Sequence, residues 1–241
     1  MTEPPTISVC MAAFNGQRYI EDQIRSILDE LPPNSELIVV DDCSTDDTRS
    51  RVTSCEDSRI RMLSLDRNGG HVKAFETALE AARGSYVFLT DQDDLWPKGR
   101  VAAMMDGLSR SRIVVGNVGL FGEGREASRI PLRAADSTAN VRNILGIFAG
   151  RRSYFGCATA IRADLLRNAL PFPDYIEAHD HWLAILGNVS GSITHLDQVV
   201  TKRRLHSNNL TAARRRSARE LLRTRIALIR SVLDAARRMQ E

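Results

Sequence analysis

The first hundred residues alternate short apolar runs with amphipathic stretches. The four runs rich in β-branched and aromatic side chains predict strands over Ile7–Ala12, Leu37–Val40, Ile60–Leu65 and Tyr86–Thr90. Between them, apolar residues with helical spacing predict helices around Glu21–Leu31, Asp46–Ser54 and Gly70–Arg83. This βαβαβαβ order predicts an α/β fold: a doubly wound, mostly parallel sheet with right-handed crossovers and helices on both faces.

The pattern is less regular after residue 97. It predicts helices over Pro97–Ser109, 143–150 and Tyr175–Gly187, and strands over Ile113–Val118, Phe155–Ile161, Ser192–Leu196 and Val199–Arg203. Residues 121–139 are rich in Gly, Arg and Ser, which predicts a variable segment outside the regular helices and strands. From Arg214 onward one long amphipathic helix is expected, because apolar residues recur every three or four positions at Leu222, Ile226, Ile229, Leu233, Ala236 and Met239.

Polar residues follow each of the first four predicted strands. The strands run into Phe14-Asn15, Asp41-Asp42, Arg67-Asn68 and Asp91-Gln92-Asp93-Asp94. In open α/β sheets, ligands bind outside the carboxyl ends of the strands. Four polar strand ends, two of them with paired acids, therefore predict a binding site at this edge.

Three acids within four residues create an electrostatic conflict at the fourth strand end. The carboxylates of Asp91, Asp93 and Asp94 repel one another, so each must raise its pKa or find a counter-charge. A divalent cation such as Mg²⁺ or Mn²⁺ would supply that charge, because hard cations take oxygen ligands. The alternative is an acidic loop with an aspartate that caps the next helix.

Charge and composition narrow the class of protein. The net charge of +3 conceals a basic tail, because residues 214–241 carry nine arginines and three acids and residues 1–213 are therefore mildly acidic. A nucleic-acid-binding body would be expected to carry a basic face, so no nucleic-acid partner is predicted. The chain has no apolar run of eighteen residues and no basic-then-apolar start, so we expect neither a transmembrane helix nor a secretory signal. Its four cysteines lack CxxC spacing, which favours reduced thiols in a cytoplasmic protein.

Phosphate-binding loops are missing from the strand ends. Neither GxGxxG nor GxxxxGK[ST] follows a predicted strand, and a GGxGTRL-type loop is also absent. If the site holds a diphosphate, a metal that bridges phosphate and carboxylate oxygens is the remaining means of binding it.

Several segments in order resemble a known family. SVCMAAFNGQRYIEDQIRSIL, ELIVVDDCSTDDT, RNGGHVKAFETALEAARGSYVFLTDQDDLWP and RLHSNNLT are similar to inverting family 2 glycosyltransferases with the GT-A fold. The similarity covers about residues 6–210, and TDQDDLWP, HDHW and RLHSNNLT are most like the rhamnosyltransferase-like branch. The resemblance implies a glycosyltransferase domain over 1–210, with a nucleotide-sugar half to about 98 and an acceptor half after it, followed by the basic tail over 211–241.

The resemblance also implies roles for the strand-end residues. Phe14, Asn15, Asp41 and Asp42 would bind the base or ribose of the donor, together with Arg67, Asn68, Asp91 and Gln92. Asp93 would be the metal ligand, with Mn²⁺ or Mg²⁺ stabilising the diphosphate leaving group. His206 would add a metal or diphosphate contact, although a lone histidine is as often structural.

Inverting transfer requires one carboxylate to deprotonate the acceptor hydroxyl. Asp180 lies in EAHDHW, at the start of a predicted helix, where the family places its base. Most members have Glu-Asp there and this chain has His179-Asp180, which leaves the role of His179 open. The alternative for Asp180 is stabilisation of a helix N-terminus.

The expected activity is transfer of a sugar from a UDP- or dTDP-linked donor, dTDP-rhamnose among them, to a hydroxyl on a glycan or lipid-linked acceptor in bacterial surface-glycan synthesis. The alternatives are a metal-dependent nucleotide-sugar hydrolase and a non-catalytic nucleotide-sugar-binding module. The tail over 214–241 predicts either a peripheral contact with an anionic membrane, at the inner face of the cell membrane, or packing on protein, including a homodimer.

Overall fold

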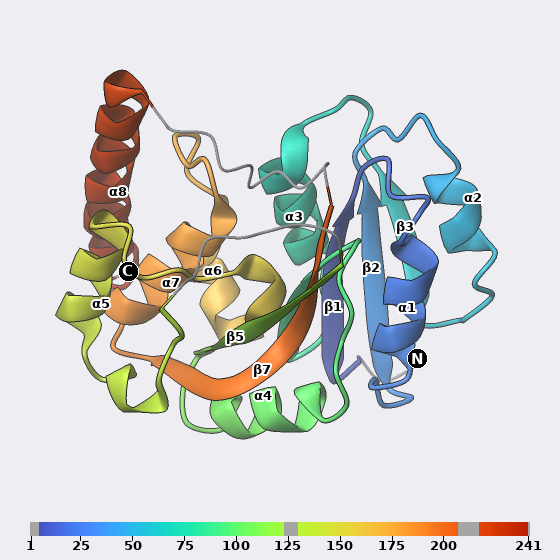
Figure 1. Cartoon of the computed structure of the whole chain (residues 1–241), viewed down its shortest axis with the longest axis horizontal. Coiled ribbons are helices and arrows are strands. Elements are labelled where there is room, and N and C mark those ends of the chain that lie inside the picture. Colours follow the sequence, from blue (N-terminus) through green and yellow to red (C-terminus); the bar gives the residue numbers. More distant parts are fainter. Residues whose placement is uncertain (1–4, 123–129, 207–216, 241) are drawn as a thin grey trace.

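The computed structural model describes residues 5–122, 130–206 and 217–240. Its centre is one seven-stranded sheet with the order β3-β2-β1-β4-β6-β5-β7 (Figure 1). The strands are β1 (Ile7–Ala13), β2 (Ser35–Asp41), β3 (Ile60–Ser64), β4 (Tyr86–Asp91), β5 (Ile113–Gly122), β6 (Thr159–Arg162) and β7 (Ile193–Leu205).

The longer helices are α1 (Ile20–Leu28), α2 (Thr48–Thr53), α3 (Gly70–Ala81), α4 (Arg100–Leu108), α5 (Asn140–Phe148), α7 (His179–Val189) and α8 (Ala218–Arg238). Short turns of helix complete the described elements: η1 (Ala134–Asp136), η2 (Gly156–Ala158), η3 (Ala163–Leu165) and α6 (Leu166–Ala169).

The sheet is mostly parallel, as the alternating pattern predicts. Strands β1, β2, β3 and β4 run parallel, and so do β5 and β7. Strand β6 runs antiparallel to both of its neighbours, β4 and β5. The chain therefore brings the carboxyl ends of β1, β2 and β4 together at one edge, with β2 between β3 and β1.

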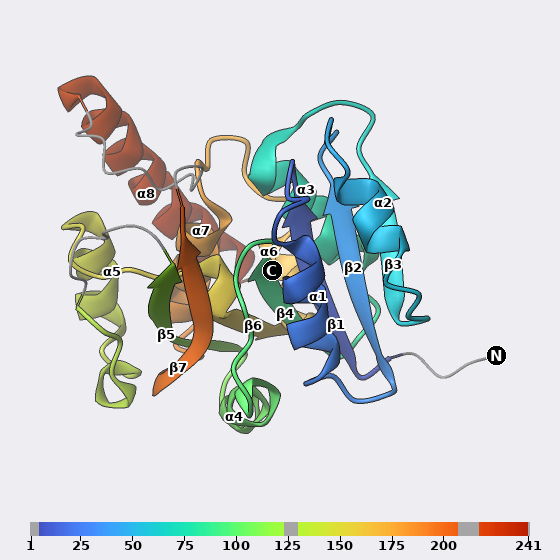
Figure 2. The ribbon, with the colours of Figure 1, turned by 45° about the vertical axis from the view of Figure 1, so that its right-hand side comes forward.

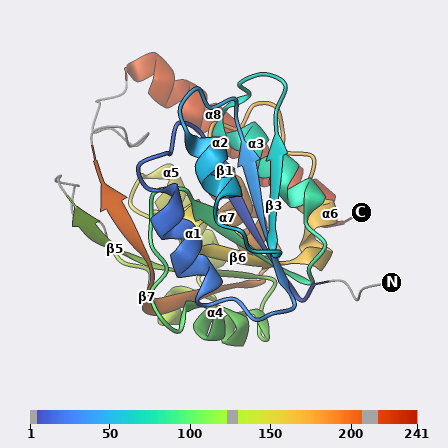
Figure 3. The same cartoon turned by 90° about the vertical axis from the view of Figure 1, so that its right-hand side faces the viewer.

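Two apolar layers sandwich the sheet. Helices α1, α2 and α4 cover one face, where Ile24 and Met104 belong to the same buried cluster as Val9 of β1. Helices α3 and α7 cover the other face, where Phe75 and Trp182 belong to the same buried cluster. Figure 2 shows α5 and α8 at the end of the molecule away from β3, and Figure 3 looks at the sheet from the β3 side.

Two strand predictions in the second half were wrong in detail. Phe155–Ile161 was expected as one strand, but Gly156–Ala158 form a 3-10 turn and only the last part joins β6. Ser192–Leu196 and Val199–Arg203 belong to the single strand β7, which is interrupted by a bulge opposite Asn117. The Asn117 amide donates hydrogen bonds to the carbonyls of Leu196 and Asp197, which satisfies the backbone where the ladder shifts.

Helix α8 packs on α7, but through a face different from the apolar stripe seen in the sequence. Its buried residues are Leu228, Ser231 and Ala235. The stripe residues Leu222, Ile226, Ile229 and Leu233 are 62%, 49%, 52% and 65% exposed. None of the described helices is long and apolar enough to cross a membrane. The predicted domain boundary near residue 210 and the arginines at 214–216 lie outside the described residues.

Candidate donor and acceptor site

The loop after β1 is held in place by the side chain that follows β4. Gln92 brackets the Phe14 backbone: its Oε1 accepts from the Phe14 N–H at 3.0 Å, and its Nε2 donates to the Phe14 carbonyl at 2.9 Å. A Cβ on Gly16 would lie 2.0 Å from Gln92 Oε1, so a side chain at this position would displace the Gln92 amide from Phe14. The Phe14 ring remains 46% exposed at this edge, in a position to contact a flat ligand.

Asn15 joins the loop after β1 to the loop after β2. Its Oδ1 accepts from the Thr45 N–H at 2.9 Å, and its own N–H donates to Ser44 Oγ at 2.9 Å. The residue has φ 48°, a left-handed conformation that asparagine tolerates better than most residues do. The two loops predicted to line one ligand therefore form one structure.

The paired acids after β2 are both buried and both engaged. The Asp42 carboxylate accepts from the N–H groups of Gly69 and Gly70, at 2.6 and 2.9 Å. Gly70 has φ 79°, which brings the first N–H groups of α3 onto this carboxylate. Asp41 pairs with Arg49 at 2.8 Å, and it also accepts from the Ser44 N–H.

These bonds give Asp42 a structural task in addition to its predicted contact with the donor. Because its two oxygens hold the start of α3, the carboxylate fixes the position of the predicted donor residues Arg67 and Asn68. Asn68 also donates from Nδ2 to the Asp42 carbonyl at 3.1 Å, and Arg67 is exposed at the same edge.

The three acids at the end of β4 show the predicted conflict. Burial and the neighbouring Asp94 and Asp93 charges raise the pKa of Asp91 well above its ordinary value. Burial and Asp93 raise the pKa of Asp94 to about 7. A cation bound here would oppose both shifts by stabilising the charged carboxylates.

Asp93 and His206 come together from distant parts of the chain, as the two predicted metal ligands should. Asp93 Oδ2 lies 2.8 Å from His206 Nε2, and the imidazole stacks on the Tyr19 ring with centroids 4.8 Å apart. Arg204 donates from Nε to the Asp93 carbonyl at 3.1 Å, and its guanidinium lies over the Tyr19 ring. Sequence reasoning did not single out Tyr19 or Arg204, although Arg204 begins the RLHSNNLT segment.

The donor set at this edge fits a hard divalent cation. Carboxylate oxygens with one imidazole suit Mn²⁺, and carboxylates with phosphate oxygens suit Mg²⁺. Among the described residues, Asp91, Asp94 and Cys157 place ligand atoms within 4.8 Å of one another. Burial raises the pKa of the Cys157 thiol well above its ordinary value, so the carboxylates rather than a thiolate would serve as ligands.

Asp180 lies in the first turn of α7. Its Oδ1 accepts from the His181 N–H at 2.7 Å, and the residue is partly exposed. Its charge adds to those that raise the pKa of Asp91, after burial and the nearer acids. The predicted base therefore lies within electrostatic reach of the predicted donor edge.

His179, the departure from the family pattern, is buried beneath this turn. Its ring contacts Phe75 and His71 of α3, with centroids 4.1 and 5.9 Å away. Burial lowers the pKa of His179 to about 4, so the ring is neutral. A Cβ on Gly156 would lie 2.3 Å from His179 Nε2, so this glycine makes room for the ring. The histidine packs the start of α7 against α3.

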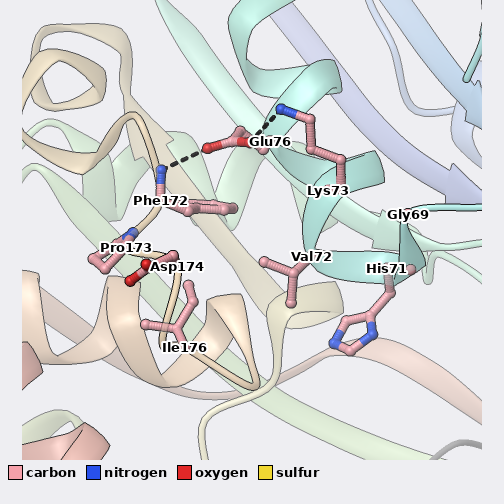
Figure 4. A pocket seen from close by; sticks show the side chains of 10 residues that line it. Gly69, His71, Val72, Lys73, Glu76, Phe172, Pro173, Asp174 and Ile176 are labelled. Atoms are coloured by element: carbon pink, nitrogen blue, oxygen red, sulfur yellow. Dashed lines mark hydrogen bonds and ion pairs between the residues drawn. The ribbon is translucent and has the colours of Figure 1, made fainter.

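A cavity of about 380 Å³ opens beside His71. It lies between the first turns of α3 and the segment that leads into α7, and Figure 4 shows the side chains of Lys73, Phe172 and Asp174 around it. Glu76 accepts hydrogen bonds from the Phe172 N–H and from Lys73, which fixes this wall. Apolar and charged side chains therefore share the lining of this cavity.

Comparison with known proteins decides the family. Residues 8–168 match the model described as Glycosyl transferase family 2. The chain belongs to glycosyl transferase family 2. A family 2 relative from Bacillus subtilis (strain 168), the putative teichuronic acid biosynthesis glycosyltransferase TuaG, is 41% identical over 104 residues, which are 42% of this chain and 41% of that protein.

Two further similarities cover more of this family 2 chain. The Escherichia coli protein WfgD, a UDP-Glc:alpha-D-GlcNAc-diphosphoundecaprenol beta-1,3-glucosyltransferase, is 26% identical over 86% of this chain and 79% of its own length. S. aureus TarS 1-349 in complex with UDP-GlcNAc superimposes with a TM-score of 0.74 at 21% identity, over 98% of this chain and 70% of that one. The TarS likeness supports the predicted GT-A fold.

Proposed function

We propose that this chain transfers a sugar from a uridine or thymidine diphosphate donor to an acceptor hydroxyl, with inversion, in bacterial surface-glycan synthesis. The observation that carries the proposal is that the turn with Asp180 packs on α3 beside the donor edge. His179 in this turn contacts His71 at the start of α3, where the N–H of Gly70 donates to the Asp42 carboxylate. The Asp180 charge also adds to those that raise the pKa of Asp91. A single carboxylate on the side opposite the leaving group is what inverting transfer requires.

In this proposal, Asp180 takes the proton from the acceptor hydroxyl. Phe14, Asn15, Asp41 and Asp42 bind the base and ribose, with help from Arg67, Asn68, Asp91 and Gln92. The hydrogen bonds among these loops hold the donor edge in one arrangement before a ligand arrives, which lowers the entropy cost of binding.

The proposed metal is Mn²⁺ or Mg²⁺, and it would neutralise the charge that develops on the diphosphate leaving group. Asp93 and His206 would hold it. Tyr19 and Arg204 would keep the imidazole and the Asp93 backbone in place, through the ring stack and the hydrogen bond to the carbonyl.

The acceptor would approach from the cavity between α3 and α7, which lies beside the turn that carries Asp180. A glycan or a lipid-linked sugar fits this proposal, because the relative WfgD is named for a diphosphoundecaprenol-linked acceptor. A cytoplasmic site at the inner face of the cell membrane would give the chain access to both the nucleotide sugar and such an acceptor. The donors to test include UDP-glucose, UDP-GlcNAc and dTDP-rhamnose.

A test combines binding and turnover. A panel of nucleotide sugars is first screened by thermal shift, since a bound donor stabilises the fold by mass action. The selected donor, radiolabelled, is then incubated with and without glycan acceptors, with Mn²⁺ or with EDTA. Transfer that needs both acceptor and metal supports the proposal. Release of free sugar without acceptor would indicate a hydrolase, binding without either reaction would indicate a binding module, and full transfer in EDTA would exclude the metal.

Asp93→Asn is the variant that tests the proposed metal ligand. It removes a charged ligand from the loop after β4 with little change in side-chain size, so the fold should persist while metal-dependent transfer is lost. Asp66→Asn, an exposed acid at the same edge, is the control and should retain transfer.

A further inference from the structure

Helix α8 presents a separate apolar face to solvent. Leu222, Ile226, Ile229 and Leu233 are spaced at four, three and four residues, so they form one stripe, here called the outer stripe. Each of the four side chains is about half exposed or more. The opposite face, with Leu228 and Ala235, packs on α7. The outer stripe is therefore not needed for the fold of the described chain.

Arginines flank the outer stripe. At 100° per residue, the exposed Arg219, Arg223 and Arg230 lie along one side of it, and the partly buried Arg225 lies on the other. The helix from Ala218 to Arg238 contains six arginines and two acids. Both acids already have partners, because Glu220 closes the capping box with Ser217 and Asp234 accepts from the Tyr175 hydroxyl at 2.6 Å. The surface around the stripe is thus strongly positive.

We propose that α8 docks this chain on an anionic lipid bilayer, with the outer stripe in the headgroup boundary and the flanking arginines on lipid phosphates. An amphipathic helix with an apolar face and a basic border is the structure that such a surface binds. The charge argues against a second copy as the occupant. Two α8 helices packed through their outer stripes would bring arginine borders together without an acid to compensate them.

The orientation of α8 connects this surface with the acceptor side. The Tyr175 hydroxyl bonds to Asp234, the Arg230 guanidinium lies 3.9 Å from the Tyr175 ring centroid, and Thr224 donates to Glu177. Tyr175 and Glu177 belong to the segment that leads into Asp180. A bilayer that binds α8 would therefore lie next to the segment that lines the proposed acceptor cavity and leads into Asp180.

The test uses the full chain and vesicle co-sedimentation. Vesicles that contain phosphatidylglycerol are compared with pure phosphatidylcholine vesicles, at low and high salt. The expected result is sedimentation with the anionic vesicles alone, weakened by salt. Leu222→Gln/Ile229→Gln/Leu233→Gln should reduce the bound fraction by about tenfold or more, because it removes the apolar face. Arg219→Gln/Arg223→Gln should weaken binding and its salt dependence.

Matched controls distinguish docking through the outer stripe from non-specific adsorption of exposed apolar side chains. Met62→Gln/Leu120→Gln removes exposed apolar side chains from β3 and β5 and should bind vesicles like the unchanged protein. Circular dichroism and urea unfolding establish that each variant is folded. The proposal is overturned if the full chain stays in the supernatant, if both lipids bind it equally, or if the triple variant sediments normally. It is also overturned if the outer stripe instead supports a dimer in analytical ultracentrifugation without vesicle binding.

Discussion

The polar side chains of the donor edge and those at the start of α7 differ in how many hydrogen bonds they form with the described chain. At the donor edge, the side chains of Asp42, Asn15 and Gln92 all accept hydrogen bonds from the backbone of a neighbouring loop, so the loops fix one another in position. At the start of α7, Asp180 accepts one hydrogen bond within the described residues, from the next N–H in the chain. The His179 ring nitrogens have no partner among the described residues. The difference teaches that the loops of the donor edge fix one another without a ligand, whereas Asp180, the proposed base, makes fewer bonds to the described chain.

The largest expected effect concerns Asp180. Asp180→Asn removes the proposed base and leaves the donor edge intact, so turnover should fall by about 10²–10⁴-fold while donor affinity stays near the unchanged value. Steady-state kinetics and donor titration measure the two quantities. Asp106→Asn, which alters an exposed acid on α4, is the control. A parallel loss of donor affinity would show that Asp180 binds donor or supports the fold.

The second effect concerns pH and the two buried histidines of the acceptor half. Burial lowers the pKa of His179 and of His195 to about 4, from an ordinary 6.5. The unfolded chain takes up these protons first as the pH falls, so stability should be full above 6.5 and lost between 6.5 and 4. The loss should be about 3 kcal/mol for each histidine at the lower limit.

Urea unfolding across this pH range measures that dependence, and His195→Phe should remove about half of it. The donor half offers the contrast. Burial alone would raise the pKa of Glu36, but hydrogen bonds from Arg83, Ser8 and Arg61 outweigh it and lower the pKa to about 2. The Glu36 contribution is therefore full above pH 4.5 and is lost between pH 4.5 and about 2, mostly below the window of the two histidines. If His195→Phe leaves the slope unchanged, another group accounts for it.

The third effect tests how far the donor edge depends on its own acids. Asp42→Asn replaces one of the two acceptor oxygens that hold Gly69 and Gly70 with an amide that cannot accept. We expect a loss of about 1–3 kcal/mol in the free energy of unfolding, together with weaker donor binding. Chemical denaturation and donor titration provide the measurements. An Asp42→Asn protein as stable as Asp66→Asn would mean that the α3 start holds without this carboxylate.

The smallest effect tests whether α8 belongs to the acceptor half. Tyr175→Phe removes the hydroxyl that donates to Asp234 but keeps the ring beneath Arg230. A loss of about 1 kcal/mol in the free energy of unfolding is expected, because the bond is partly exposed. Tyr86→Phe, which alters a tyrosine on β4 instead, is the comparison. Equal stability for Tyr175→Phe and the unchanged chain would show that the bond to α8 contributes nothing.

Local patterns determined the first half of the fold. The strands β1 to β4 and the helices between them were predicted close to their observed bounds, because each strand is a short apolar run and each crossover is local in sequence. The polar strand ends likewise placed Asp42, Asp91 and Asp93 at one edge, since parallel strands share a direction. Their roles as donor or metal residues stay predictions.

The second half depended on long-range contacts that periodicity does not record. The sequence break near Asp197 looked like the end of a strand, but Asn117 of β5 satisfies the backbone there and β7 continues. Likewise, only the structure shows that His206, directly after β7, lies beside Asp93 in the loop after β4.

Helix α8 shows most clearly what the sequence determines and what the tertiary structure decides. The sequence by itself determined that a basic amphipathic helix exists, because spacing and charge are local properties. Only the tertiary structure decided which face is buried. The small residues Ser231 and Ala235 allow α7 to approach closely with Leu228, so packing selects that face and leaves the larger side chains of the outer stripe in solvent.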